Sequence, residues 1–354
     1  MYCRLRTPTY LLDFTKELTM SQLLELDSSL DEDLIVYRTI DFFSAADIIE
    51  NRRFMFSRAD TFSDKNEGID RILRQLNLAT PNNGCGMGWS DAESAKDQHN
   101  QLKQSHYISC WSRNPESVAM WSLYSTDLCS IRVSTKISKL IFPIEELIKK
   151  YSVDRLNDAD LGKKVIVATK GHIAPVVYTS LMQIANRVGN RAKARFRLAE
   201  RYAKKGESMP SFPKKNSKYL TSKIYSKYLK LQTTTSLKDS SFEHEQEIRL
   251  SVKFGEETWS ERLVNKEYID PSSEHHYLLS TLLSDFSFIN HGRLPEREFV
   301  SCTEDFIESV AIDPRCPVHK AEFMKNWFNA HGIKIVESTC FGYLPDKFKI
   351  YPEW

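Results

Sequence analysis

Strand-like and helix-like segments follow one another along this chain without a regular order. Short runs rich in β-branched and aromatic residues predict strands, whereas capped segments with helical spacing of apolar residues predict helices. A doubly wound parallel sheet requires strict alternation of the two, so the order favours an α+β fold with mixed, largely antiparallel sheets and flanking helices. The strands are predicted at 33–40, 54–57, 106–112, 129–135, 164–169, 173–180, 247–252, 310–313 and 333–339, and the helices at 44–54, 115–125 and 319–332.

The composition is that of a globular protein with a substantial core. The 354 residues are 41% hydrophobic and 27% charged, a balance that excludes a disordered chain. We expect an extension at 1–33, in which Met20 is an alternative start, followed by one α+β domain at 34–345 and a tail at 346–354. A basic helical insertion is expected within the domain at about 181–231.

Hydropathy and cysteine usage indicate the compartment. No run of about eighteen apolar residues is present, and Asp13 and Lys16 interrupt the N-terminal apolar stretch, so we expect a cytoplasmic protein that contacts no membrane. The seven cysteines are scattered and never form a C-x-x-C pair. Free thiols and the absence of a zinc or other metal site are therefore expected.

Positive charge is concentrated in one stretch, Arg187 to Lys230. This stretch contains fourteen Lys or Arg and two Glu, whereas the whole chain has a net charge of only +2. Tyrosines interleave with the basic residues, a pattern typical of surfaces that bind RNA or single-stranded DNA. A solvated helical arm explains the same charge equally well. The candidate nucleic-acid contacts are Lys214, Lys215, Lys218, Lys223, Tyr225 and Tyr228.

Negative charge is concentrated at the start of a predicted strand. Glu243, Glu245 and Glu247 occupy alternate positions, so in an extended chain their side chains share one face of the sheet. Carboxylates this close raise one another's pKa, as in sites for acid–base chemistry. The structural alternative is the solvated face of an edge strand.

Five motifs in order resemble a bacterial domain-of-unknown-function family, numbered 2971. They are "VYRTI", "FSRADTFSDKNEG", "SCWSRNPESVAMWSLYS", "FEHEQEIRL" and "VAIDPR". The chain departs from the family pattern at Phe242, His244 and Asp313, where Trp, Tyr and Gly are usual. This resemblance supplies little chemistry, because the function of the family is unknown.

A looser resemblance implies an activity. Arginine-type ADP-ribosyltransferases have an Arg on a first strand, a Ser on a second and Glu-x-Glu at a later one, similar to Arg38, Ser109 or Ser112, and Glu245-Gln246-Glu247 here. The resemblance implies an NAD-using transferase with a macromolecular target and, by analogy, a toxin or phage-defence role.

Each candidate residue has an implied role. Glu247 would stabilise an oxocarbenium-like transition state, and Glu245 would polarise the acceptor. Arg38 would hold the pyrophosphate, and Ser109 would bind the ribose or orient Glu247. The remaining candidates for NAD binding are Tyr37, Ser112 and Trp111.

Other interpretations of the same residues stay open. Trp111, Met120 and Tyr124 fit core packing better than ring stacking on a ligand. The carboxylates fit a nucleic-acid-binding module in which they are structural. They also fit a metal-dependent nuclease that uses Glu245, Glu247 and an acid from the loop at 60–67.

Overall fold

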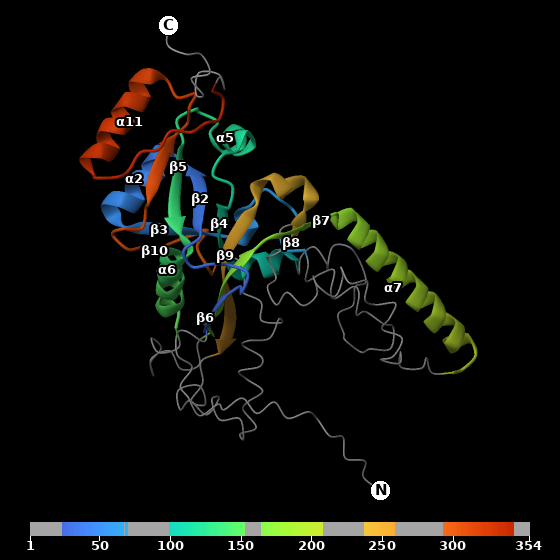
Figure 1. Cartoon of the computed structure of the whole chain (residues 1–354). Coiled ribbons are helices and arrows are strands. Elements are labelled where there is room, and N and C mark those ends of the chain that lie inside the picture. The colour runs from blue at the N-terminus through green and yellow to red at the C-terminus, as the bar shows by residue number, and fades with distance from the viewer. Residues whose placement is uncertain are drawn as a thin grey trace.

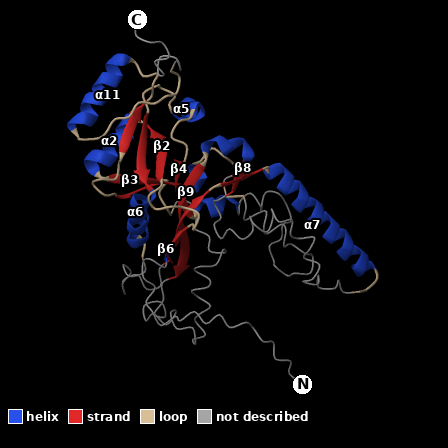
Figure 2. Cartoon of the chain, viewed as in Figure 1, coloured by secondary structure: helices blue, strands red, loops and turns tan. Residues whose placement is uncertain are grey.

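A largely antiparallel nine-stranded sheet forms the centre of the computed structural model, which describes residues 23–66, 68–69, 99–152, 164–207, 237–258 and 293–342 (Figures 1 and 2). Its strand order is β1-β6-β9-β4-β2-β5-β11, and β3, which pairs with β4, carries β10 on its other side. Mixed helices and antiparallel strands confirm the predicted α+β class. The strands are β1 (Leu24–Leu26), β2 (Ile35–Ile40), β3 (Arg53–Arg58), β4 (His106–Ser112), β5 (Ile131–Lys136), β6 (Lys164–Pro175), β9 (Glu247–Thr258), β10 (Arg297–Ser301) and β11 (Ser309–Ile312).

Helices cover the sheet, and three of them enclose the main core. Side chains of α2, α6 and α11 join those of the strands in one buried cluster, on the side of the sheet where Figure 1 shows these helices. A second sheet of two strands, β7 and β8, lies at the base of α7. The helices are α2 (Phe42–Asn51), α5 (Val118–Tyr124), α6 (Ile137–Lys150), α7 (Leu181–Lys204) and α11 (Val318–Ala330), with β7 at Val177–Thr179, β8 at Leu237–Asp239 and 3₁₀ turns η1 at Ala59–Thr61 and η5 at Ser240–Glu245.

Helix α6 was not predicted, although its apolar period is regular. Pro143 lies in the middle of the helix, where it removes one backbone hydrogen bond. Ile137, Leu140, Ile144 and Leu147 are fully buried on one face. Burial of this face against the sheet outweighs the local cost of the proline.

Three expectations about strands need correction. The expected N-terminal extension contains β1, which pairs in parallel with β6, and Leu30 is buried. The predicted strand at 333–339 makes only an isolated bridge, between Ile335 and Val310. Strand β10 was not predicted at all. Whether a short segment forms a strand at the edge of a sheet depends on the neighbouring strand it pairs with, and the local sequence does not reveal that neighbour.

Two helix starts also differ from the prediction. The helix predicted from residue 44 starts at Phe42 as α2, and Asp41 caps it because its carboxylate accepts from the Ser44 amide. The helix predicted from residue 115 starts at Val118 as α5, and Ser117 caps it by accepting from the Met120 amide. The end of α11 is as predicted, with Gly332 in the left-handed region at φ +69°.

The sheet forks at β4. One edge of β4 pairs with β9 along its whole length, from His106 to Ser112. The other edge pairs with β3 at Tyr107 and Ile108, and with β2 only through the Tyr37–Ser112 pair. Strands β2 and β3 therefore diverge from the same edge of β4.

Candidate active site

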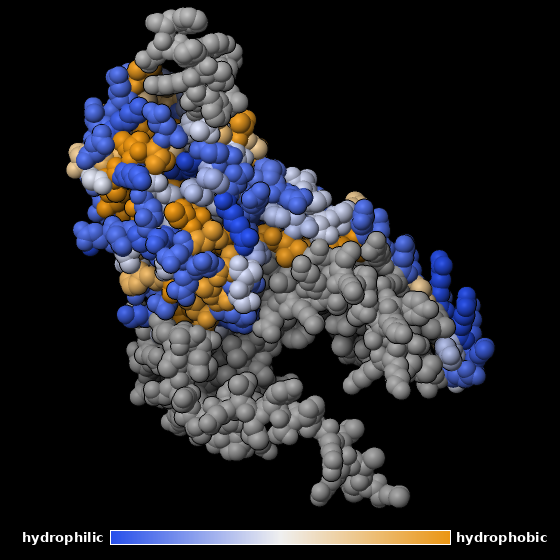
Figure 3. Space-filling view, viewed as in Figure 1, coloured by the Kyte–Doolittle hydropathy of each residue, from blue (hydrophilic) through white to orange (hydrophobic). Residues whose placement is uncertain are grey.

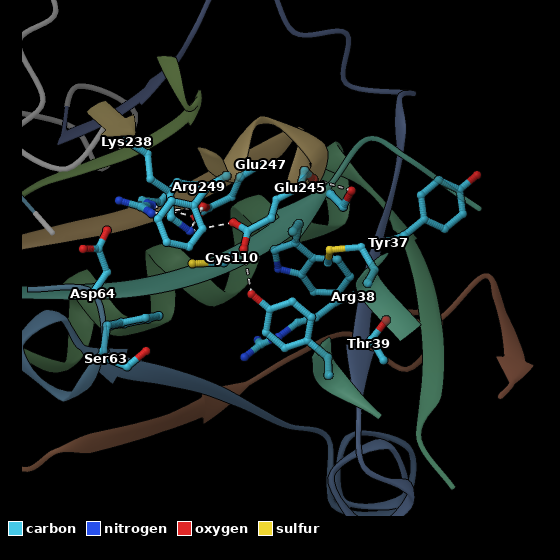
Figure 4. Close-up of a pocket in the computed structure, with 16 residues that line it drawn as sticks. Tyr37, Arg38, Thr39, Ser63, Asp64, Cys110, Lys238, Glu245, Glu247 and Arg249 are labelled. Carbon is cyan, nitrogen blue, oxygen red and sulfur yellow. Dashed lines mark hydrogen bonds and ion pairs between the residues drawn. The ribbon is translucent and has the colours of Figure 1, made fainter. Parts of the chain in front are cut away.

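The fork in the sheet opens onto a cavity of about 260 Å³. Figure 4 shows Lys238, Arg249, Glu247 and Glu245 gathered on one side of it, with Arg38 entering from β2 and Asp64 and Ser63 from the loop after β3. Three charged groups of each sign therefore meet in one pocket. The lining is completed by Tyr37, Thr39, Phe62, Cys110, Trp111, Ser112, Met120, Tyr124 and Phe242.

The predicted strand does begin at Glu247, but Glu243 and Glu245 precede it in a turn, so the expectation that the three carboxylates share one face of an extended strand was wrong. Ser240 to Glu245 form a 3₁₀ turn, and Gln246 follows in the left-handed region at φ 43°. Strand β9 begins only at Glu247. The turn leaves Glu243 exposed and carries Glu245 into the pocket beside Glu247. Tertiary contacts set this conformation, since an αL residue other than Gly costs free energy.

Every oxygen of the two pocket carboxylates accepts a hydrogen bond. The Glu245 oxygens accept from the Tyr124 hydroxyl at 2.9 Å and from Lys238 Nζ at 2.6 Å. The Glu247 oxygens accept from Arg249 Nε at 2.7 Å, from Arg249 Nη2 at 3.1 Å and from Lys238 Nζ at 3.3 Å. The ring of Phe242 covers the Lys238 ammonium at 4.4 Å. The carboxylates are therefore not the solvated face of an edge strand.

Charge pairing keeps Glu247 ionised despite its burial. Burial alone favours the neutral acid, but Arg249 and then Lys238 outweigh it and hold the pKa of Glu247 below its ordinary value. The same carboxylates raise the pKa of Lys238 against the effect of its burial. Burial and the neighbouring Glu245 raise the pKa of the Tyr124 hydroxyl, which stays a donor at neutral pH. The site holds fixed charges rather than a poised proton.

Arg38 is the cation of the pocket without an acidic partner. Its Nη1 donates to Ser109 Oγ at 2.8 Å, and among the described residues no carboxylate lies within ion-pair distance. Part of its side chain faces the cavity, yet protein surrounds the guanidinium, and this desolvation lowers the pKa of Arg38. An arginine remains charged even so. An enclosed cation without a counter-ion favours the binding of an anion in the pocket.

The two serine candidates have structural partners. Ser109 pairs across the strands with Leu250 and so faces the core side of the sheet, whereas Glu247 is opposite Ser112. Ser109 therefore does not orient Glu247 as expected, and its hydroxyl accepts from Arg38 instead. The expected contact of Ser109 with a ribose stays a prediction. Ser112 Oγ donates to the Glu245 carbonyl at 2.6 Å and thereby fixes the turn.

The aromatic candidates differ in orientation. The Tyr37 ring lies over the guanidinium of Arg132, at 5.4 Å, and in Figure 4 it points away from Glu245 and Glu247. Trp111 is 2% exposed and stacks on Phe54, so the packing interpretation holds for most of its ring. Its indole Nε1 has no hydrogen-bond partner within the described residues, although the residue lines the cavity.

Three site residues were missed from the sequence. Lys238 lies in a short polar strand without a recognisable motif, and only the fold brings it to the carboxylates. Tyr124 was interpreted as a packing residue, whereas its hydroxyl binds Glu245. Cys110, which lies on the same face of β4 as Ser112, adds a thiol hydrogen bond to Glu247. The two-residue spacing of Cys110 from Ser112 on a predicted strand was the one signal in the sequence that could have identified Cys110 as a site residue.

The candidate nucleic-acid contacts belong to a different part of the chain from the pocket. Lys214, Lys215, Lys218, Lys223, Tyr225 and Tyr228 lie outside the described residues. The described part of the basic stretch, residues 187–207, has eight Lys or Arg and two Glu. Most of it lies in helix α7, which projects from the body of the molecule in Figure 1.

Comparisons with known proteins return no relative. No protein-family model matches the chain, and no curated protein or solved structure does either. None of the described helices is long and apolar enough to cross a membrane. In the same residues, no group of three or more His, Cys, Asp or Glu side chains is placed to hold a metal ion.

Proposed function

We propose that this protein is an ADP-ribosyltransferase-like enzyme that binds NAD in the pocket at the fork of the sheet. The observation that carries the proposal is Arg38, which has no acidic partner among the described residues and faces the pocket together with two carboxylates held by hydrogen bonds. NAD has the matching groups, a pyrophosphate anion and a ribose whose bond to nicotinamide breaks with positive charge on the sugar. The toxin or phage-defence context and the cytoplasmic location belong to the same proposal.

The two carboxylates would have different tasks. Glu247 already accepts from three nitrogens and the Cys110 thiol, which fills the four acceptor positions of a carboxylate. It would act through its charge, by stabilising an oxocarbenium-like transition state. Glu245 accepts only from Tyr124 and Lys238 among the described residues and so retains acceptor positions for a hydroxyl of the substrate. Glu245 is therefore the carboxylate that would touch the ribose or the acceptor.

The pocket fits one half of the dinucleotide. Its volume of about 260 Å³ lies near the lower end of small-molecule sites. Phe62, Met120, Tyr124 and Phe242 supply apolar and aromatic surface for a nicotinamide ring. The adenosine half would extend out of the cavity past Arg38.

The nuclease alternative has less support. A catalytic metal needs carboxylate oxygens as ligands, whereas Arg249, Lys238 and Tyr124 occupy those of Glu245 and Glu247. Two cations beside the same oxygens also repel a metal ion. The nucleic-acid-binding alternative depends on residues outside the described part of the chain, so nothing in the pocket favours it.

The test measures NAD binding and nicotinamide release by the purified full chain. Glu245→Gln should lower the rate of release at least about tenfold, because one charge-assisted contact is lost in the transition state. Glu243→Gln is the matched control: this residue is exposed on the same 3₁₀ turn, and its loss should leave the rate unchanged. A folded wild-type protein that neither binds NAD nor releases nicotinamide would refute the proposal.

A further inference from the structure

Two cysteines far apart in the sequence meet beside a lysine, away from the candidate active site. Cys129 precedes β5 and Cys316 lies in the turn before α11, yet their sulfur atoms are 4.0 Å apart. The ammonium of Lys320 lies 3.5 Å from the Cys129 sulfur. The chain separation of 187 residues means that only the fold creates this contact.

The backbone holds both segments in place. The Asp313 amide donates to the Ser130 carbonyl at 3.1 Å, and the Cys316 amide donates to the Asp313 carbonyl at 2.9 Å. A disulfide needs the two sulfurs at about 2.05 Å, so the pair is reduced and must approach by about 2 Å to bond. Rotation about the side-chain torsions can supply such a shift without unfolding either segment.

A groove provides access to this pair. A cavity of about 760 Å³ runs between α2 and α11, and Cys129 and Lys320 lie on its wall with Phe42, Phe323 and Trp327. Figure 3 shows apolar residues gathered on the side of the molecule where Figure 1 places these two helices. Cys129 is 7% exposed, so a small oxidant reaches it through the groove whereas a protein thiol does not.

The surroundings distinguish the two sulfurs. Cys129 Sγ accepts from both the Lys320 ammonium and the Cys316 thiol, which makes it the sulfur best placed to attack an oxidant. Burial and the neighbouring Cys129 raise the pKa of Cys316 to about 11, so Cys316 keeps its proton as the donor. Cys302 and Cys340 contact oxygens instead, the Ile48 carbonyl and the Glu116 carboxylate.

We propose that Cys129 and Cys316 form an oxidative modification site for small hydroperoxides. The Cys129 sulfur attacks the peroxide, the O–O bond breaks, and the leaving oxygen takes up the proton of the Cys129 thiol, so the products are Cys129 sulfenic acid and water or an alcohol. Cys316 then attacks the sulfenic sulfur, which closes a disulfide and releases a second water. The peroxide is reduced by two electrons, and the two thiols are oxidised by two.

The modification would act on a turn that supports the candidate active site. Ser130 follows Cys129, and its hydroxyl donates to the Tyr124 carbonyl at 3.2 Å. Tyr124 in turn binds Glu245 through its hydroxyl. Any effect on NAD turnover rests on the proposed function, whereas disulfide formation does not.

The experiment treats the reduced full-length protein with hydrogen peroxide, blocks remaining thiols and maps peptides without reduction by mass spectrometry. The expected product is a cross-link between the Cys129 and Cys316 peptides that lacks two hydrogens and disappears with dithiothreitol. Cys316→Ala should instead accumulate Cys129 sulfenic acid, trapped by a 1,3-dione. Lys320→Met should slow oxidation several-fold, and Lys325→Met, exposed on the same helix, should not.

Two outcomes would overturn the proposal. One is oxidation of Cys129 and Cys316 without a cross-link between them in the wild type. The other is a cross-link that forms at the same rate in Lys320→Met. Both are measured on peptides, so they are independent of whether the protein uses NAD.

Discussion

Substituting Arg38 with glutamine separates ligand binding from folding. The guanidinium is enclosed, has a lowered pKa and, within the described chain, bonds only to Ser109. Loss of that hydrogen bond costs about 1 kcal/mol, and removal of a desolvated, unpaired charge offsets it. We therefore expect the free energy of unfolding of Arg38→Gln to change by less than about 1 kcal/mol.

The affinity for NAD should respond much more strongly. A hydrogen bond to a charged group contributes about 1.5–3 kcal/mol, and each 1.4 kcal/mol corresponds to a factor of ten. Arg38→Gln should weaken NAD binding about 10- to 150-fold if the guanidinium holds the pyrophosphate. Calorimetric titration with NAD and urea unfolding measure the two quantities on the same samples.

Arg249→Gln is the contrasting variant. Arg249 is also enclosed, but it donates twice to Glu247, and both side chains are 3% exposed. Its loss leaves a buried carboxylate with only Lys238 as its cation, and breaking a buried pair costs about 3–5 kcal/mol. If Arg38→Gln destabilises the fold as much as Arg249→Gln, or binds NAD as the wild type does, the assignment of Arg38 to anion binding is wrong.

Three further changes test the energetics of the fold. His172 is buried, and its pKa is lowered to about 4, mainly by desolvation and then by the charge of Lys170. Below pH 6.5, the ordinary pKa of histidine, the unfolded chain therefore takes up a proton at His172 that the folded chain does not. The contribution of His172 to the free energy of unfolding is therefore fully present above pH 6.5. Urea unfolding should show a loss of about 2 kcal/mol between pH 7 and pH 5, and the variant His172→Gln should largely lack this pH dependence. Glu116 accepts from Arg132, Ser338 and the Cys340 amide, so Glu116→Gln should cost about 2 kcal/mol and speed hydrogen exchange at Cys340; unchanged exchange would contradict this role. At Gly171 a Cβ atom would lie 2.7 Å from Ile144 Cγ2, so Gly171→Ala should lower stability by about 1–3 kcal/mol in thermal unfolding, whereas Gly189→Ala in α7 meets open space and should not.

The sequence by itself determined the class of the fold and the positions of its strongest elements. Short runs of β-branched and aromatic residues located β2, β4 and β5, and the apolar period ended by Gly332 located α11. These signals are local, because period and capping depend on residues within one or two turns. The resemblance also led to Arg38, Glu245 and Glu247, which do line one pocket.

Only the tertiary structure decided how those residues meet. The turn at Gln246, the fork at β4 and the arrival of Lys238 all depend on contacts between segments distant in the sequence. The same holds for Arg38, whose chemistry follows from the absence of a nearby carboxylate in the described chain rather than from its own identity. Strand pairing and charge pairing are long-range interactions, so spacing along the chain predicts which residues are available but not which partners each one finds.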